Sequence, residues 1–254
     1  MQLEKEQSLL VPRLRFIFSM VLVVAWTMFC AGVGTIWALF RWKSPHYNHE
    51  MGLLLGGGAM RLMGIRLEIE GYEQLHRHQP CVYILNHQSM LDGLSFAALF
   101  PRATVVIAKT GVGWIPFFGL LYRAGGNILI NRKNRAHSLK GLNRAAGRMR
   151  TRGYSILIFP EGTRNSTHYG SLLPFKKGAF YVAKTAHVPL VPVLCEPHRH
   201  VVDFQRGLLF GGPLRIKVLP PIDPHSEQFK GKSLEAVIEY SRNVMLEALK
   251  EIRK

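Results

Sequence analysis

The chain has 254 residues, of which 48% are hydrophobic and 19% charged, so it can bury the core of one large domain and is not intrinsically disordered. Lys and Arg outnumber Asp and Glu by 33 to 16, and the net charge of +17 indicates an anionic partner: nucleic acid, anionic lipid or an acidic protein. Three widely spaced cysteines, Cys30, Cys81 and Cys195, exclude a disulfide framework and a zinc ribbon.

The first predicted element is the apolar segment Phe16–Phe40, which contains 25 residues and no Asp, Glu, Lys, Arg or His. A helix needs about 20 such residues to cross the hydrocarbon of a bilayer. The segment is longer than the apolar core of a signal peptide, and it ends in the aromatic and basic residues Trp37, Arg41 and Lys43. It therefore predicts a membrane anchor.

A second apolar segment, Met51–Gly64, is too short to cross a membrane and carries Arg61. The polar residues Ser44–Glu50 predict a turn between the two segments. Basic residues flank the long segment on both sides, so two arrangements stay open: a single span, or a helical hairpin lying in one leaflet. We expect residues 1–64 to form the anchor and residues 65–254 to form one domain. In either arrangement we expect the domain to lie on the cytoplasmic side of the cytoplasmic (inner) membrane, because it is strongly basic and its cysteines are unpaired.

Beyond the anchor, short β-rich segments alternate with helical patterns, which predicts an α/β sheet. Helices are expected at Gly93–Phe100 and Asn134–Arg152, and a C-terminal helix is expected to begin after the N-cap residue Ser233. The predicted strands are Ile65–Glu70, Cys81–Leu85, Thr104–Ala108, Asn127–Ile130, Ser155–Phe159, Pro189–Leu194 and Leu214–Leu219.

Positive charge is concentrated between Arg102 and Arg164, where twelve Lys and Arg residues accompany a single acid, Glu161. Part of it repeats every four residues along one helix face, at Lys140, Arg144, Arg148 and Arg152. This stripe is either a solvated face or a surface for an anionic partner, and no neighbouring acids are spaced to pair with it. Residues 132–152 contain no Phe, Tyr or Trp on which bases could stack, so we do not expect nucleic acid to bind.

His87 and Asp92 follow directly on the predicted strand that ends at Leu85. Five residues apart, they cannot face each other in a regular helix or strand, but they can meet across a turn. In such a turn Asp92 would accept the Nδ1 proton of His87, and Nε2 would be free to take a proton from a substrate hydroxyl.

A second polar loop, Pro160–Arg164, follows the strand that ends at Phe159. Arg164 has the planar fork that grips a phosphate, and Glu161 can hold a polar group of a substrate. The same residues are also compatible with a structural turn that carries a surface ion pair.

These segments together resemble the glycerophospholipid acyltransferase family, over roughly Met63 to Pro221, with four family blocks in order. Asn131 stands where the family often has Asp. The blocks are Asn86-His87-x4-Asp92; Gly126–Arg132, preceded by Trp114–Gly119; Phe159–Arg164, followed by Leu173–Phe180; and Val188–Val193.

The resemblance implies a mixed, largely parallel central sheet flanked by helices. It implies His87 as general base, held by Asp92, and a phosphate-bearing acceptor. The residues implied to bind that acceptor are Glu161, Gly162, Thr163, Arg164, Arg132 and Lys109. The reaction implied is transfer of a fatty acyl group from acyl-CoA or acidic acyl-carrier protein to the sn-2 hydroxyl of 1-acyl-glycerol-3-phosphate, without cofactor or metal.

Three alternatives remain beside this expectation. The acceptor could instead be a lyso-ornithine lipid or a lysophospholipid with a headgroup, although an acceptor without phosphate would leave Arg132 and Arg164 unpaired. A membrane-tethered nucleic-acid binder is supported by charge alone. Finally, the segment Cys195–His200 contains metal-ligand residue types, but its spacing matches no common site.

Overall fold

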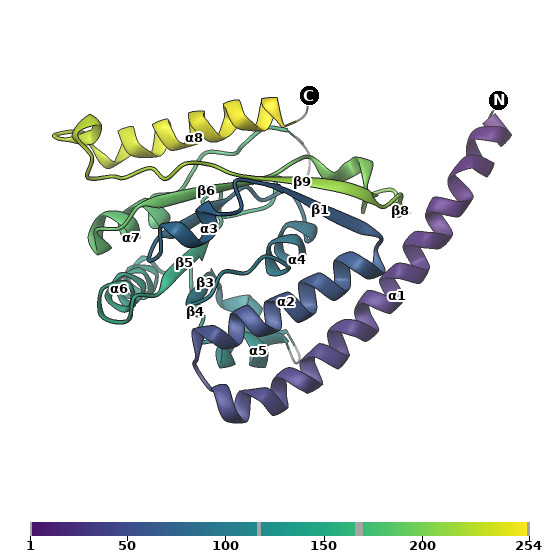
Figure 1. The fold of residues 1–254 in the computed structure, drawn as a ribbon, viewed down its shortest axis with the longest axis horizontal. Coiled ribbons are helices and arrows are strands. Elements are labelled where there is room, and N and C mark those ends of the chain that lie inside the picture. The colour runs from purple at the N-terminus through teal and green to yellow at the C-terminus, as the bar shows by residue number, and fades with distance from the viewer. Residues whose placement is uncertain (1, 116–117, 166–169, 253–254) are drawn as a thin grey trace.

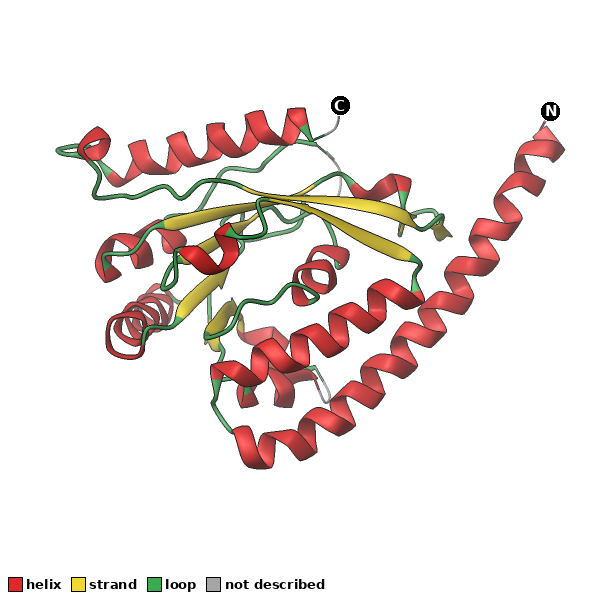
Figure 2. Ribbon diagram, in the orientation of Figure 1, coloured by secondary structure: helices red, strands yellow, loops and turns green. Residues whose placement is uncertain are grey.

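The computed structural model describes residues 2–115, 118–165 and 170–252. Its centre is a seven-stranded sheet in the order β1-β9-β6-β2-β5-β3-β4, with helices on both faces (Figures 1 and 2). All neighbouring strands pair in parallel except β6 and β9, which are antiparallel. The predicted mixed, largely parallel sheet is confirmed. Its strands are β1 (Ile65–Glu70), β2 (Val82–Leu85), β3 (Thr104–Lys109), β4 (Ile128–Ile130), β5 (Ser155–Ile158), β6 (Leu190–Cys195) and β9 (Gly212–Val218).

The two faces of the sheet bury two separate apolar clusters, because alternate residues of each strand point to opposite sides. In β2, Val82 and Ile84 pack toward α6 (Arg135–Arg152), α7 (Gly178–Ala186) and α8 (Leu234–Glu251). Tyr83 and Leu85 pack toward α4 (Leu91–Ala97) and α2 (Pro45–Leu62). The central strand β2 is buried throughout, which suits a parallel strand covered on both faces.

Helices α6 and α8 begin with the expected side-chain caps. The side chain of Asn134 accepts the His137 N–H at the start of α6, and Gly153, at φ 63°, ends that helix. The Ser233 side chain accepts the Ala236 N–H at the start of α8, as the sequence predicts. The remaining elements are α3 (Gln74–Arg77), α5 (Phe118–Ala124), the 3-10 helices η1 (Thr110–Trp114), η2 (His198–His200) and η3 (Glu227–Phe229), and the hairpin of β7 (Val202–Asp203) and β8 (Leu208–Leu209).

The N-terminal helix α1 (Gln2–Arg41) is one long helix, and α2 returns antiparallel to it along the body of the protein (Figure 1). Between Leu9 and Arg41 it is long and apolar enough to cross a membrane, with a mean hydropathy of 2.3. Small residues bring these helices close together. Gly58 of α2 lies under the Trp26 ring of α1, and Gly56 lies against the backbone of α4.

Three details of the structure differ from the sequence predictions. Ser44–Glu50 is not a turn throughout, because Ser44 is an N-cap and Pro45, pre-organised for a first helical turn, starts α2 there. The helix expected at Gly93–Phe100 is α4, which begins at Leu91 and therefore includes Asp92 in its first turn. The sequence patterns did not predict helix α7, which has only nine residues and exposes a narrow face at Tyr181, Lys184 and Thr185.

We expect Gly56→Ala to destabilise the protein, since the added Cβ would lie 2.3 Å from the Ala98 nitrogen and 2.5 Å from the Leu94 oxygen. Such overpacking costs about 1–3 kcal/mol. Gly57→Ala is the matched control, because nothing lies within 4 Å of a Cβ there and alanine favours a helix by up to about 1 kcal/mol. Thermal unfolding of the full chain in detergent measures both. A Gly56→Ala variant that melts no lower than wild type would contradict this packing.

Candidate active site

The predicted site residues lie at one edge of the sheet, where the carboxyl ends of five strands meet. Strands β6, β2, β5, β3 and β4 run in the same direction, so their carboxyl ends lie side by side. His87 follows β2, Glu161–Arg164 follow β5, Lys109 ends β3 and Arg132 follows β4. The carboxyl edge of a parallel sheet is where such folds bind ligands. The structure thus brings segments that are up to 77 residues apart in the sequence to one edge.

His87 and Asp92 meet across the turn that the spacing required. His87 Nδ1 lies 3.0 Å from Asp92 Oδ2, and the same oxygen accepts the backbone N–H groups of Gln88 at 2.5 Å and Ser89 at 2.7 Å. Asp92 is buried, whereas the His87 side chain is 18% exposed. Nε2 of His87 makes no hydrogen bond with any residue in the described ranges. Asp92 therefore orients the imidazole with its second nitrogen available.

The loop after β5 holds the backbone of His87 from both sides. Glu161 Oε1 accepts the His87 N–H at 2.8 Å, and the Asn165 N–H donates to the His87 carbonyl at 2.7 Å. The second oxygen of Glu161 accepts the Leu173 N–H at 2.9 Å. The two sequence motifs are thus one hydrogen-bonded unit, in which the second motif positions the first.

Glu161 has a different environment from the one expected for a substrate contact. The residue is 2% exposed, and both of its oxygens already accept backbone N–H groups. Burial is the main cause that raises its pKa to about 7; the N–H groups of Leu173 and His87 oppose the shift. Glu161 therefore positions the backbone of His87, and its direct contact with the acceptor stays a prediction.

Further contacts fix the His87 turn. The Phe159 ring stacks on the His87 imidazole, with centroids 4.2 Å apart and planes 27° apart. The side-chain amide of Asn86 donates to the Cys195 carbonyl and accepts the Cys195 N–H, each at 2.9 Å. Gln88 Nε2 also donates to the Cys195 carbonyl, at 3.0 Å. These bonds tie the turn to the end of β6. Sequence reasoning assigned no role to Phe159, Asn86 or Gln88, although all three are large side chains inside the motif blocks.

The basic candidates divide into two kinds. Arg132 donates to the carbonyl of Gly162, which has a positive φ of 73°, and so links the ends of β4 and β5. Arg164, Thr163 and Lys109 are exposed. In the ranges that the structure covers, neither Arg164 nor Lys109 makes a hydrogen bond or ion pair, so both can take an anionic ligand.

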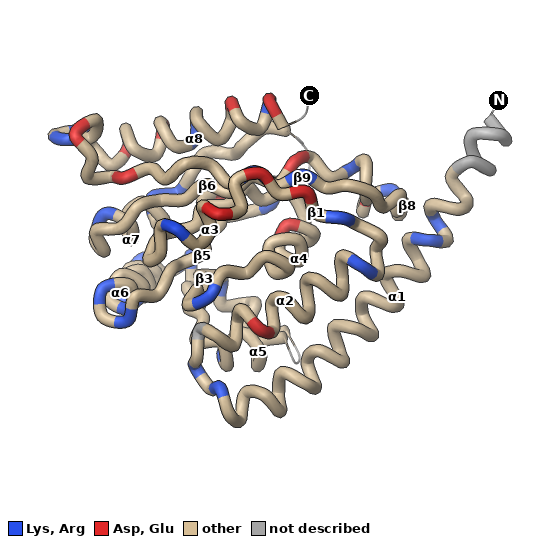
Figure 3. The backbone as a smooth tube through the Cα atoms, in the orientation of Figure 1, with Lys and Arg blue, Asp and Glu red and all other residues tan. Residues whose placement is uncertain are grey.

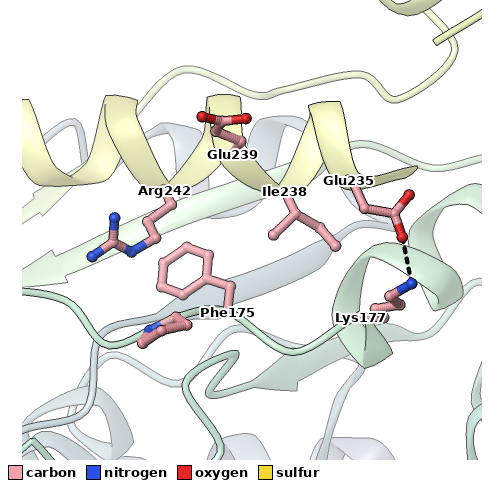
Figure 4. Close-up of a pocket in the computed structure, with 7 residues that line it drawn as sticks. Phe175, Lys177, Glu235, Ile238, Glu239 and Arg242 are labelled. Atoms are coloured by element: carbon pink, nitrogen blue, oxygen red, sulfur yellow. Dashed lines mark hydrogen bonds and ion pairs between the residues drawn. The ribbon is translucent and has the colours of Figure 1, made fainter. Parts of the chain in front are cut away.

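A cavity of about 370 Å³ lies outside this edge, between α8 and the segment that follows the β5 loop (Figure 4). Phe175 and Ile238 line it, and the Lys177–Glu235 ion pair lies at one end. Arg242, which also lines it, donates to the carbonyls of Leu172 and Leu173. The cavity therefore borders the far side of the segment whose Leu173 N–H holds Glu161. Among the described residues, no group of three or more His, Cys, Asp or Glu side chains is placed to hold a metal ion.

A family model described as Acyltransferase matches residues 66–196, a range that contains the predicted site residues. The chain belongs to this family. It is 31% identical to 1-acyl-sn-glycerol-3-phosphate acyltransferase of Escherichia coli (strain K12), over 94% of this chain and 95% of that protein. It is also 31% identical to human 1-acyl-sn-glycerol-3-phosphate acyltransferase alpha, over 95% of this chain and 83% of that protein.

The fold is also similar to a solved structure, that of the 1-acyl-sn-glycerophosphate (LPA) acyltransferase PlsC from Thermotoga maritima. The TM-score is 0.68 at 21% identity, and the match covers 94% of this chain and 98% of the other. The relatives named above are O-acyltransferases, and so is this enzyme. The resemblance drawn from the four sequence blocks is confirmed.

Glu161→Gln tests the link between the two loops. One amide NH2 would face a backbone N–H that needs an acceptor, so we expect turnover to fall at least about tenfold. The variant also removes an ionisable group, the Glu161 carboxyl, and with it the dependence of stability on pH that this group causes. Because the folded-state pKa of Glu161, about 7, exceeds the ordinary 4.5, its protonation stabilises the wild type most below pH 4.5, and this contribution is lost as pH rises to about 7.

The stability advantage of wild type over Glu161→Gln should therefore shrink between pH 4.5 and 7, by roughly 1–3 kcal/mol. Chemical unfolding at several pH values measures this difference. An advantage that stays constant or grows with pH would mean that Glu161 is not a buried carboxylate with a raised pKa.

Proposed function

We propose that this enzyme acylates the sn-2 hydroxyl of 1-acyl-glycerol-3-phosphate, with His87 as general base, and so forms phosphatidic acid. The observation that carries the proposal is the His87–Asp92 pair, which has one imidazole nitrogen available at the edge that also presents exposed Arg164 and Lys109. The names of the relatives at 31% identity support the same acceptor.

In the proposed reaction, His87 Nε2 takes the proton of the acceptor hydroxyl as its oxygen attacks the thioester carbonyl. The Asp92 carboxylate and the Phe159 ring then lie against an imidazolium, which both stabilise. The tetrahedral intermediate collapses with loss of the thiolate, which takes the proton back from His87. The chemistry uses the acyl thioester as co-substrate and no further cofactor.

The phosphate of the acceptor would be held by Arg164, with Lys109 and Arg132 adding positive charge. A guanidinium binds phosphate through two parallel hydrogen bonds, which a lysine cannot reproduce. Thr163 and the Gly162 turn, in this proposal, shape the same loop. An acceptor without phosphate would have no partner for this cluster.

The donor would be acyl-CoA or acyl-carrier protein, both of them anionic. Figure 3 shows Lys and Arg along α6, where Lys140, Arg144 and Arg152 are exposed. Arg148 is partly buried and donates to the Gly126 carbonyl at 2.5 Å, so only three of the four stripe residues remain for an anionic partner. We propose that this face attracts the donor or an anionic membrane surface.

The contacts of α1 support a helical hairpin that lies in one leaflet rather than a single helix that spans the membrane. Its outer face exposes large apolar side chains, while Ser19 bonds to the Leu62 carbonyl, Trp26 to the Leu54 carbonyl and Trp37 to Glu50. These bonds hold α1 against α2, and Arg15 of α1 donates to the Phe210 carbonyl at 2.7 Å, so α1 stays alongside the domain. We propose attachment to the cytoplasmic membrane, with the domain in the cytoplasm, where the buried free cysteines stay reduced.

His87→Ala tests the function itself. We expect kcat for acylation of lysophosphatidic acid to fall by at least about 10²–10⁴-fold, because the variant lacks the proposed general base. Purified full-length protein is assayed with acyl-CoA and, separately, with acyl-carrier protein as donor. Near-normal turnover of the variant would show that His87 is not the general base. If the wild type acylated only another lysolipid, the proposed acceptor would be wrong.

Arg164→Ala should lower kcat/KM for lysophosphatidic acid by about 30-fold or more, since truncating one side of a desolvated charge pair costs about 2–5 kcal/mol. Arg164→Lys should recover only part of it. Arg66→Ala, on the exposed edge strand β1, is the matched control and should retain wild-type activity. Equal effects on lysophosphatidic acid and on phosphate-free lyso-ornithine lipid would argue against a phosphate contact.

A further inference from the structure

Asp92 is bonded unevenly through its two oxygens. Oδ2 accepts three hydrogen bonds, from His87, Gln88 and Ser89. Oδ1 is fully buried and accepts none from the residues that the structure describes. Nε2 of His198 lies 3.9 Å from Oδ1, and both side chains are at most 2% exposed. A second imidazole therefore lies near the Asp92 oxygen that does not contact His87.

His198 reaches this position from β6, the strand beside β2. It starts the short helix η2, three residues after β6 ends at Cys195. Gln88 Nε2 donates to the carbonyls of Cys195 and Glu196, at 3.0 and 3.2 Å, and Asn86 pairs with Cys195. Side chains of the His87 turn thus fix the segment that carries His198. The Phe204 ring, edge-on at 6.4 Å, packs against the imidazole.

The separation of 3.9 Å is longer than a hydrogen bond, but hydrogen bonds of catalytic groups commonly shorten when substrate binds. Burial, as the largest cause, lowers the pKa of His198, while the charge of Asp92 opposes this shift. A neutral imidazole can donate Nε2–H to Oδ1 and orient the carboxylate. A cation there would instead compete with His87 for the charge of Asp92. The other titratable groups nearby are His200, Glu196 and Cys195.

We propose that His198 is a positioning residue of the acyl-transfer site, which holds Oδ1 of Asp92 and so keeps Oδ2 aligned with His87. The three side chains form a row across the ends of β2 and β6: His87, Asp92 and His198. The inference rests on the proposed function of His87 as general base. It assigns a role to the segment Cys195–His200, which the sequence left as an unassigned cluster of metal-ligand residue types.

The test compares three substitutions in the full-length enzyme. His198→Phe keeps the ring and removes the donor, so kcat should fall about 10- to 100-fold with less than about a twofold change in the KM for lysolipid. His198→Gln offers an amide N–H in place of Nε2–H and should restore most of kcat. His46→Phe, at an exposed histidine of α2, is the matched control and should keep kcat within about twofold of wild type.

A double-mutant cycle separates a positioning role from a packing role. If His198 acts through Asp92, His198→Phe should have almost no further effect on kcat in an Asp92→Asn background. Additive losses, or a kcat of His198→Phe within twofold of wild type, would overturn the proposal. So would failure of His198→Gln to recover more activity than His198→Phe.

Nitrogen-15 NMR of labelled histidines gives a readout without turnover. The wild type should show His87 as the Nδ1–H tautomer, His198→Phe should show a mixture of tautomers, and His198→Gln should keep the single form. If the wild type acylates no lysolipid, the proposed function fails, and the tautomer still decides the role of His198. An unchanged His87 tautomer in His198→Phe would overturn the positioning role.

Discussion

The buried carboxylate of Glu161 is the contact on which the arrangement of the site depends. It joins the loop after β5 to the turn after β2 by accepting the His87 N–H, and it joins both to the segment before α7 by accepting the Leu173 N–H. Burying a carboxylate is unfavourable, and its raised pKa reflects this cost. The cost is offset by the two backbone donors, which would otherwise lack acceptors. His87, the proposed general base, is therefore fixed through its backbone as well as through its side chain.

How much of this follows from the sequence depends on the range of the interaction. The strands could be predicted because short runs of β-branched and other apolar residues favour them, whether they alternate with polar residues, as in β1, or are continuous, as in the buried β2. Strand β1 has the predicted bounds, Ile65–Glu70. The His87–Asp92 contact could also be predicted, since five residues can meet only across a turn. The identity of Glu161 as a bridge could not, because its partners, His87 and Leu173, lie 74 and 12 residues away. Sequence spacing carries no information on such pairings.

The same reasoning explains why the sequence predicts only part of the arrangement of the N-terminal helices. The apolar length of residues 16–40 predicts contact with lipid, but it does not distinguish a helix that crosses a bilayer from one that lies against a domain. That distinction depends on a stripe of small and polar residues, including Ser19, Ala31 and Gly34, which face α2 and α5. In lipid, helices associate through close van der Waals packing and side-chain bonds rather than through apolar bulk. The predicted division at residue 64 stays a prediction, because α1 and α2 pack on the body of the protein.

The bonded attachment of α1 along the domain has a consequence for substrate choice. Once the outer face of α1 lies at the hydrocarbon boundary, the distance from that boundary to the His87 nitrogen is fixed by the rigid body of the protein. The enzyme would then discriminate acceptors by how far their free hydroxyl stands above the acyl chains. Two lysolipids with identical headgroups but different positions of the free hydroxyl would differ in reactivity for a purely geometric reason.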